Sequence, residues 1–245
     1  MLINLSERSN QPELMDSFEE PIGSLELVFQ DINSVNSLLG GNNITMKAIL
    51  QLMDTQKKEQ YTIVDMGCGD GNMLREVALY FRKHKLKASF IGIDLNEKAL
   101  EIARKNAKEF PEIRFLYQDI LTLKEEDLKC DILINTLTMH HFTDDQVLIF
   151  LNKFTKLAQI GVVINDLQRS RWAYYLFHLF SAIFIKTRIA KIDGLISIQR
   201  AFIKKELKSY AKKLPNVSHD IQWKWAFRYL WVMKPIKKQS TSHIV

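Results

Sequence analysis

Cysteine is scarce in this chain, and its arrangement gives no sign of a structural role. The 245 residues include only Cys68 and Cys130, and neither belongs to a CxxC pair or to a cluster of cysteine and histidine. Structural zinc sites and disulfide frameworks leave such clusters in a sequence. We therefore expect a protein of a reducing compartment, without a disulfide framework and without a metal site.

Long apolar runs are missing as well. The longest, residues 172–185, is interrupted by His178 and Ser181 and is too short to span a bilayer, which takes about 20 residues. The opening stretch MLINLSERSNQPELMDSFEE carries charges where a signal peptide needs its apolar region. These features predict a cytoplasmic protein and leave peripheral contact with the inner face of a membrane open.

The excess of basic residues is small and lies late in the chain. Lysine and arginine together number 34 against 28 aspartates and glutamates, which gives a net charge of +6. Lysines concentrate in residues 204–213, and Lys234, Lys237 and Lys238 lie beyond them. This distribution suits an anionic partner such as RNA or a membrane surface, and it equally suits a solvated helix face with a frayed tail.

The spacing of apolar residues divides the chain into three parts. In residues 24–39 apolar side chains recur every three or four positions, as in a helix with one apolar stripe, and Gly40 and Gly41 end that pattern. A second helix is predicted from about Thr45. We interpret residues 1–58 as an N-terminal helical cap or lid, residues 59–235 as the main domain, and residues 236–245 as a basic and polar tail.

From residue 61 onward, short apolar runs alternate with helical patterns, which is typical of a parallel sheet covered on both faces. An aromatic and alternating stretch at the end of the domain predicts a closing antiparallel hairpin. The fold class is therefore α/β: a Rossmann-like, doubly wound and mostly parallel sheet with a closing antiparallel hairpin and an N-terminal helical cap. The predicted strands are 61–66, 89–94, 113–117, 131–135 and 160–165, and the predicted helices are near 72–84, 96–107, 144–158, 170–186 and 198–213.

Two helix starts carry specific signals. Asn96 is a good N-cap residue for the helix near 96–107, because its short side chain can accept a hydrogen bond from a free backbone N–H. Thr143 and Gln146 have the spacing of a capping box at the start of the helix near 144–158. These signals fix where the two helices begin.

The stretch YTIVDMGCGDGNML places Gly67, Gly69 and Gly71 directly after the first predicted strand. Glycines between a strand and a helix let a ligand approach the backbone, because no Cβ stands in the way. The dinucleotide fingerprint needs its third glycine one residue later, where Asn72 stands. A nicotinamide dehydrogenase is therefore the least favoured interpretation.

Charge around the glycines favours a cationic ligand. Asp65 and Asp70 flank the loop, and two carboxylates would repel a pyrophosphate but attract a ligand with positive groups. S-adenosylmethionine carries an ammonium and a sulfonium and no phosphate. Asp94, at the end of the second predicted strand, is placed to accept both ribose hydroxyls of an adenosine. After the third strand, Asp119 is a candidate for the adenine amino group, although a turn role is the ordinary interpretation of such a residue.

Four motifs in this order resemble those of class I S-adenosylmethionine-dependent methyltransferases: VDMGCGDGNML, IGIDLNEKALEIARKN, YQDIL and CDILINTLTMHHF. The resemblance implies S-adenosylmethionine as cofactor and S-adenosylhomocysteine as product. For the methionine moiety it implies contacts from Asp65, Gly67, Cys68 and Gly69. For the ribose, the adenine and the sulfonium end it implies Asp94 with Leu95, Asp119 with Ile120, and Asn135. Cys68 is then a small loop residue without a nucleophilic role.

The residues just after the fourth predicted strand indicate the acceptor. Enzymes that methylate the exocyclic amines of nucleic acid bases usually carry two prolines and an aromatic residue there, whereas this chain has NTLTMHHF. The MHHF ending resembles the branch that acts on small molecules. We expect methyl transfer to an oxygen or carbon of a small aromatic, polyketide, quinone-like or lipid-like acceptor, and no nucleic acid partner. The alternatives are an RNA methyltransferase and a non-catalytic S-adenosylmethionine-binding protein.

Several residues near the predicted sheet edge are candidates for work on the acceptor. His140 is a candidate general base, with Asp166 as the alternative base, since either would take a proton from a hydroxyl acceptor. The candidate substrate-binding residues are His141, Tyr174 and Tyr175, and Phe177 is a further candidate for the lining of the acceptor pocket. For both histidines and for the aromatic helix that holds the tyrosines, core packing is the competing interpretation. The sequence does not indicate an oligomeric state.

The N-terminal cap is expected to act as a lid that closes over the site and contributes to acceptor specificity. Its charged residues Arg8, Glu13 and Asp16 are equally compatible with a solvated surface.

Overall fold

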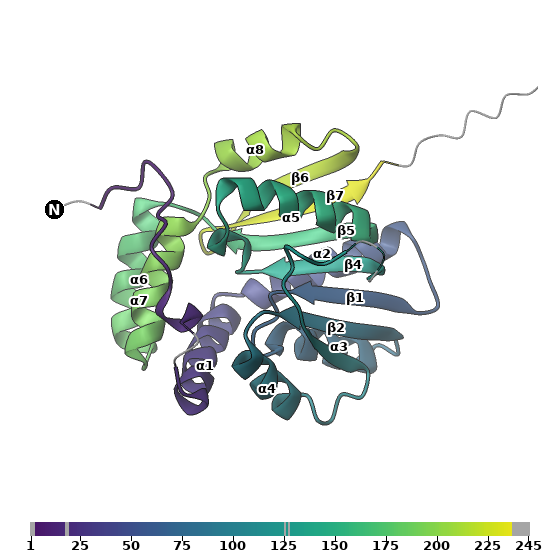
Figure 1. Ribbon diagram of the computed structural model, residues 1–245, viewed down its shortest axis with the longest axis horizontal. Coiled ribbons are helices and arrows are strands. Elements are labelled where there is room, and N and C mark those ends of the chain that lie inside the picture. The colour runs from purple at the N-terminus through teal and green to yellow at the C-terminus, as the bar shows by residue number, and fades with distance from the viewer. Residues whose placement is uncertain (1–2, 18–19, 125, 127, 237–245) are drawn as a thin grey trace, which may run out of the picture.

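The computed structural model describes residues 3–17, 20–124, 126 and 128–236. Its centre is a seven-stranded sheet in the order β3-β2-β1-β4-β5-β7-β6 (Figure 1). Five strands are parallel, and only the last two run antiparallel to their neighbours. The predicted fold class is confirmed. The predicted tail, residues 236–245, lies outside the described residues except for Ile236.

The strands begin and end close to their predicted positions. Those in the middle of the sheet are buried along almost their whole length, so their sequences are the continuous apolar runs from which they were predicted. The strands are β1 (Tyr61–Met66), β2 (Ala88–Asp94), β3 (Ile113–Tyr117), β4 (Cys130–Thr136), β5 (Ala158–Leu167), β6 (Val217–Lys224) and β7 (Arg228–Pro235).

Both predicted helix starts are present. The Asn96 side chain accepts a hydrogen bond from the Ala99 N–H, and Thr143 with Gln146 forms a capping box. The α-helices are α1 (Ile22–Leu38), α2 (Gly41–Thr55), α3 (Asn72–Lys83), α4 (Glu97–Asn106), α5 (Asp144–Leu157), α6 (Arg171–Phe184), α7 (Arg188–Arg200) and α8 (Lys204–Lys212), with short 3-10 turns η1 (Leu14–Asp16) and η2 (Met139–His141).

The segment between α6 and β6 differs most from the prediction. One basic helix was expected over 198–213, but α7 occupies 188–200 and α8 begins only at Lys204. The chain breaks between them because Phe202 is fully buried and pairs with Gln168, just beyond β5. The second cap helix also begins earlier than predicted, at Gly41, directly after Gly40 turns the chain with a φ of +72°.

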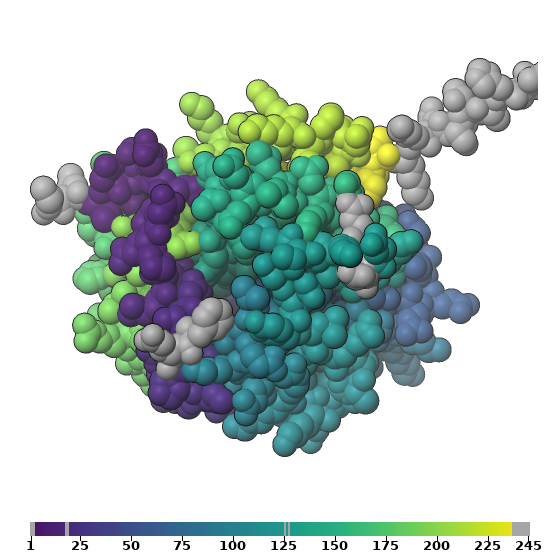
Figure 2. Space-filling model, in the orientation of Figure 1, coloured from purple at the N-terminus to yellow at the C-terminus, as the bar shows by residue number. Residues whose placement is uncertain are grey.

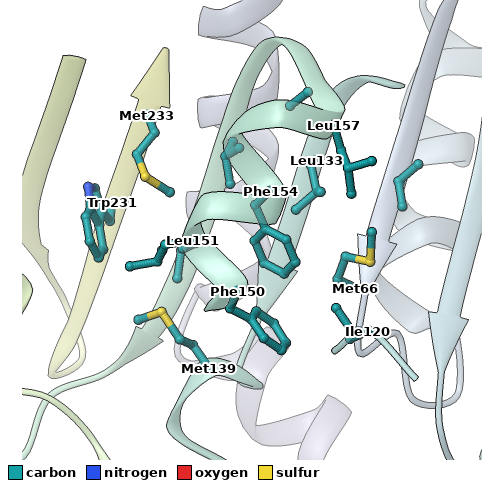
Figure 3. Packing of buried hydrophobic residues seen from close by; sticks show 14 of the residues in the cluster. Met66, Ile120, Leu133, Met139, Phe150, Leu151, Phe154, Leu157, Trp231 and Met233 are labelled. Atoms are coloured by element: carbon teal, nitrogen blue, oxygen red, sulfur yellow. The ribbon is translucent and has the colours of Figure 1, made fainter. Parts of the chain in front are cut away.

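Two apolar cores lie on opposite faces of the sheet. On one face, Phe150 and Phe154 of α5 pack with Trp231 of β7 and with strand residues such as Met66 (Figure 3). On the other face, α2 and α3 cover the same strands. This doubly wound packing fixes the sheet, and the strand ends that it presents are where open α/β sheets bind ligands.

A further helical layer lies beside the carboxyl ends of the parallel strands. It contains α1, α6 and α7, and the N-terminal strap (residues 3–17) runs across it (Figures 1 and 2). Asp193 of α7 accepts the backbone N–H groups of Leu14 and Met15, and the Ser9 N–H donates to the Gln199 carbonyl. Among the described residues, none of the helices combines the length and the apolar character needed to cross a membrane.

Candidate active site

A cavity of about 860 Å³ lies between the sheet and this helical layer. Its walls come from the glycine loop, the ends of β2 and β4, the strap, α1, α6, α7 and the turn between β6 and β7. Residues from both ends of the chain therefore meet at one edge of the sheet.

The glycine loop lies after β1 in a conformation that favours glycine. Gly67 and Gly69 have φ angles of +76° and +52°, in the left-handed region. A Cβ on Gly67 would also collide with the side chain of Thr138, whose hydroxyl donates to the Gly67 carbonyl. The loop is thus held by its backbone against the end of β4, with its surface facing the cavity.

The two acidic residues expected to flank the loop have different surroundings. Arg75 forms an ion pair with Asp70, and the Asn33 side chain donates to the same carboxylate. Asp65 is buried at the cavity wall, and its Oδ1 has no hydrogen-bond partner among the described residues. Burial and the nearby Asp94 raise the pKa of Asp65 well above its usual value. Of the two acidic residues at the loop, Asp70 is therefore paired with a cation and Asp65 is not.

Asp94 lies at the end of β2 on the cavity wall. One of its carboxylate oxygens accepts the Gly69 N–H at 2.8 Å and the other accepts the Asn96 N–H at 2.9 Å. These bonds orient the carboxylate toward the loop while burial raises its pKa. The next residue, Leu95, also lines the cavity and is partly exposed.

Two of the predicted cofactor contacts, Asp119 and Asn135, do not line the cavity. Ile120 is buried and lines the cavity, but Asp119 does not, and its Oδ1 accepts the N–H of Leu121 as in a turn. Asn135 is fully buried outside the cavity wall, where its amide donates to the Met66 carbonyl.

Cys68 lines the cavity, and burial together with the charge of Asp94 raises its thiol pKa well above the usual value. The thiol is therefore protonated, as a residue without a nucleophilic role would be.

At the part of the cavity beside the η2 turn, His140 stands between two carboxylates. Its Nδ1 lies 2.6 Å from Oδ1 of Asp166, and its backbone N–H donates to the other oxygen of that carboxylate. Its Nε2 lies 3.3 Å from Oε1 of Glu13, which also accepts the hydroxyl of Ser197. All three charged groups are buried, so their charges act on one another with little screening by water.

The neighbouring charges set the pKa values of His140, Glu13 and Asp166. Burial alone would lower the pKa of His140, but the charges of Asp166 and Glu13 outweigh burial and raise it to about 10. Burial would raise the pKa of Glu13, but His141 and His140 lower it to about 2. In this state His140 already holds its protons at neutral pH. Neither His140 nor Asp166, whose pKa is lowered by His140, is then free to accept a proton from a substrate.

The strap is fastened to this end of the cavity by further polar contacts. Nδ1 of His141 lies 2.9 Å from Asp16, and its Nε2 lies 3.7 Å from Glu13. Arg8 donates to the carbonyls of His140 and Phe142. Glu13 is therefore not a surface charge. Its role could not be found from the sequence because it precedes the sheet by many residues and belongs to no motif.

Of the three aromatic residues expected from the aromatic helix α6, only Phe177 lines the cavity. Tyr174 and Tyr175 do not line the cavity, and the Tyr175 hydroxyl instead accepts the N–H of Ile3. The helix residues at the cavity are Ala173, Leu176, Phe177 and Phe180.

Arg228, at the start of β7, also lines the cavity. It is buried, and its Nε and Nη1 have no hydrogen-bond partner within the described part of the chain.

A parallel sheet with β7 inserted antiparallel, a glycine loop after β1 and an acid at the end of β2 define the class I methyltransferase fold. The chain belongs to the methyltransferase domain family, which matches residues 57–234. A malonyl-[acyl-carrier protein] O-methyltransferase from Halalkalibacterium halodurans is 31% identical over 94 residues, which cover 36% of this chain and 33% of that relative. The match thus spans only about a third of the relative's length.

Solved structures share the fold at low sequence identity. The plantazolicin methyltransferase BamL, solved with a triazolic desmethylPZN analog and SAH, superimposes with a TM-score of 0.67 at 16% identity and covers 90% of this chain and 93% of its own. The magnesium protoporphyrin IX methyltransferase of Synechocystis PCC 6803, solved with SAM, gives a TM-score of 0.55 at 15% identity, covering 85% and 83%.

Asp65 generates a prediction about cofactor binding. Because its pKa is raised in the free protein, the ammonium of S-adenosylhomocysteine beside it should lower that pKa and release a proton. Affinity should therefore rise with pH as Asp65 ionises. Calorimetric titrations in two buffers of different ionisation enthalpy, repeated from about pH 5 to about pH 8, measure both effects.

The Asp65→Asn variant should lose both the proton release and this pH dependence, whereas the exposed Asp54→Asn should keep them. Equal proton release from the wild type and from Asp65→Asn would contradict the assignment.

Proposed function

We propose that this protein transfers the methyl group of S-adenosylmethionine to an oxygen or carbon of a small, largely apolar acceptor. The observation that carries the proposal is the shared cavity in which the glycine loop, Asp65 and Asp94 face the His140 turn. Such a space would hold the donor and the acceptor together and exclude water. Direct displacement from sulfur requires mainly this alignment.

The donor end fits a cationic adenosine compound. The unpartnered oxygen of Asp65 is a buried acceptor that an ammonium can satisfy, and a buried carboxylate gains most from a positive ligand. Asp94 has a carboxylate at the strand end where ribose hydroxyls bind in related folds. When bound there, S-adenosylmethionine supplies a methyl group on a positively charged sulfur. The residues of the loop orient it through their backbone.

The acceptor end combines the polar cluster around His140 with apolar side chains from α6 and with Arg228. Phe177 and Phe180 of α6 line it, which suits an aromatic or aliphatic acceptor. The unpartnered guanidinium atoms of Arg228 favour an acceptor that carries a carboxylate, phenolate or carbonyl oxygen. Acceptors of this kind also agree with the names of the relatives, which include a malonyl O-methyltransferase and a polyketide synthase methyltransferase domain.

A nucleic acid acceptor finds less support. The lysine-rich helix α8 packs beside β6 and α5, and none of its described residues lines the cavity (Figure 1). A base flipped into the site would have to pass the strap and α1, whose side chains form part of the wall.

Turnover tests the proposed function. Wild-type protein incubated with S-adenosylmethionine and a panel of apolar carboxylic acids, phenols, quinols and polyketide fragments should give a product heavier by one methylene, detected by mass spectrometry. Asp94→Ala should weaken S-adenosylhomocysteine binding by at least about tenfold, since a charged hydrogen-bond partner is worth roughly 1.5–3 kcal/mol. Glu97→Ala, an exposed acid three residues later, is the matched control.

Wild-type protein that binds S-adenosylhomocysteine but methylates no member of the panel would favour the non-catalytic alternative. Equal binding by Asp94→Ala and Glu97→Ala would remove Asp94 from the cofactor site.

We also propose that α6 contacts a membrane surface. Trp172, Leu179 and Ile183 are 73%, 65% and 77% exposed, and with Leu176 they form one stripe on the helix. Arg171 and Lys186 lie at its two ends, where they can reach anionic headgroups.

Liposomes with anionic headgroups should co-sediment the wild type at low salt, and the double variant Trp172→Ser, Ile183→Ser should lose most of that binding. A double variant with Leu79→Ser and Ile149→Ser, two exposed apolar residues on other helices, should bind like the wild type. Absence of wild-type binding would refute the membrane contact.

A further inference from the structure

Three side chains beside the cavity direct ligand atoms toward one point. Nε2 of His140 lies 3.3 Å from Oε1 of Glu13, and Nε2 of His141 lies 3.7 Å from the same oxygen. The three ligand atoms lie within 4.8 Å of one another. Ligands bound to a metal at about 2.0–2.2 Å in tetrahedral or octahedral geometry are about 3–3.6 Å apart, so the two distances from Glu13 need little adjustment to bind an ion.

The other ring nitrogen of each histidine, Nδ1, is hydrogen-bonded to a carboxylate of its own. Nδ1 of His140 lies 2.6 Å from Asp166, and Nδ1 of His141 lies 2.9 Å from Asp16. In the neutral imidazole this arrangement puts the hydrogen on Nδ1 and the lone pair on Nε2, facing Glu13. Metal-binding histidines are oriented in the same way, by a carboxylate on the ring nitrogen that does not bind the metal. The cluster has this feature twice.

Two further observations point to a bound cation. Nε2 of His140 is buried and lacks a well-aligned hydrogen-bond partner among the described residues. The group also brings three acidic residues, Glu13, Asp16 and Asp166, to two histidines. Glu13 and Asp166 are buried on either side of His140, so a cation bound at Nε2 would take the place of the proton that otherwise balances them.

We propose that Glu13, His140 and His141 bind a divalent transition-metal ion. Two imidazoles and one carboxylate suit zinc, iron, cobalt or manganese better than calcium or magnesium, which prefer oxygen ligands alone. Because all three residues line the cavity, coordination positions of the ion remain open toward it. The ion would also join the strap, through Glu13, to the turn at His140.

The role of this ion rests on the proposed function. A hydroxyl acceptor bound to the metal would release its proton to water more readily as it binds. Its oxygen would then form the new O–CH3 bond as the S–CH3 bond of the donor breaks, with S-adenosylhomocysteine as the leaving group. That role would replace the histidine base expected from the sequence. It would also select acceptors whose reactive oxygen can reach the metal while another oxygen approaches Arg228.

Cobalt binding tests the site directly. Full-length protein treated with EDTA and dialysed should bind about one equivalent of Co²⁺ and develop visible d–d absorption bands of nitrogen and oxygen coordination. His141 is 23% exposed at its side chain, so His141→Ala should fold, and cooperative thermal unfolding at a temperature close to that of the wild type checks this. His141→Ala should bind Co²⁺ at least about 100-fold more weakly, and Asp16→Asn about tenfold more weakly.

His178→Ala, which removes an exposed histidine of α6, is the matched control and should bind Co²⁺ like the wild type. Equal affinities of the wild type and His141→Ala, or the absence of saturable binding, would overturn the proposal and leave a cluster that holds protons instead. The measurement needs no acceptor, so its outcome is independent of whether methyl transfer is detected.

Discussion

The carboxylate of Asp166, buried at the end of β5, fixes the position of His140 by accepting both its ring N–H and its backbone N–H. A buried charge has to be paired, and here the pairing continues from His140 to Glu13 on the strap and from Glu13 to Ser197 on α7. One polar chain thus links the sheet, the strap and the helical layer. It adds a buried contact to the hydrogen bonds by which Asp193, Gln199 and Arg8 also hold the strap across the strand ends, where the strap forms one wall of the cavity.

The two ends of the cavity differ in how their charges are balanced. At the glycine loop, Arg75 offsets Asp70, but within the described part of the chain Asp65 and Asp94 have no cationic side chain paired with them, which prepares that end for a positive ligand. Around His140, carboxylates and histidines are paired within the protein. We propose that the donor binds at the glycine loop and the acceptor beside the His140 turn.

The sheet could be predicted from the sequence because its buried strands are continuous apolar runs and the glycine loop marks the first turn. The site could be predicted only where its residues come at or just after strand ends, as Asp65, Asp94 and His140 do. Glu13 comes from a segment without periodicity, and nothing local shows that it meets His140. Helix α7 was missed because its buried positions include Asp193 and Ser197, so polar residues face inward. They do so because they bind the strap, which only the tertiary structure reveals.

The most direct measurement of the proposed division of the cavity is a crystal structure with S-adenosylhomocysteine. We expect its ribose hydroxyls to contact Asp94, its amino group to contact Asp65, and its sulfur to face the cluster of Glu13, His140 and His141 across the cavity. A ligand whose ribose lies away from Asp94, or whose sulfur points away from that cluster, would contradict the assignment of the two ends.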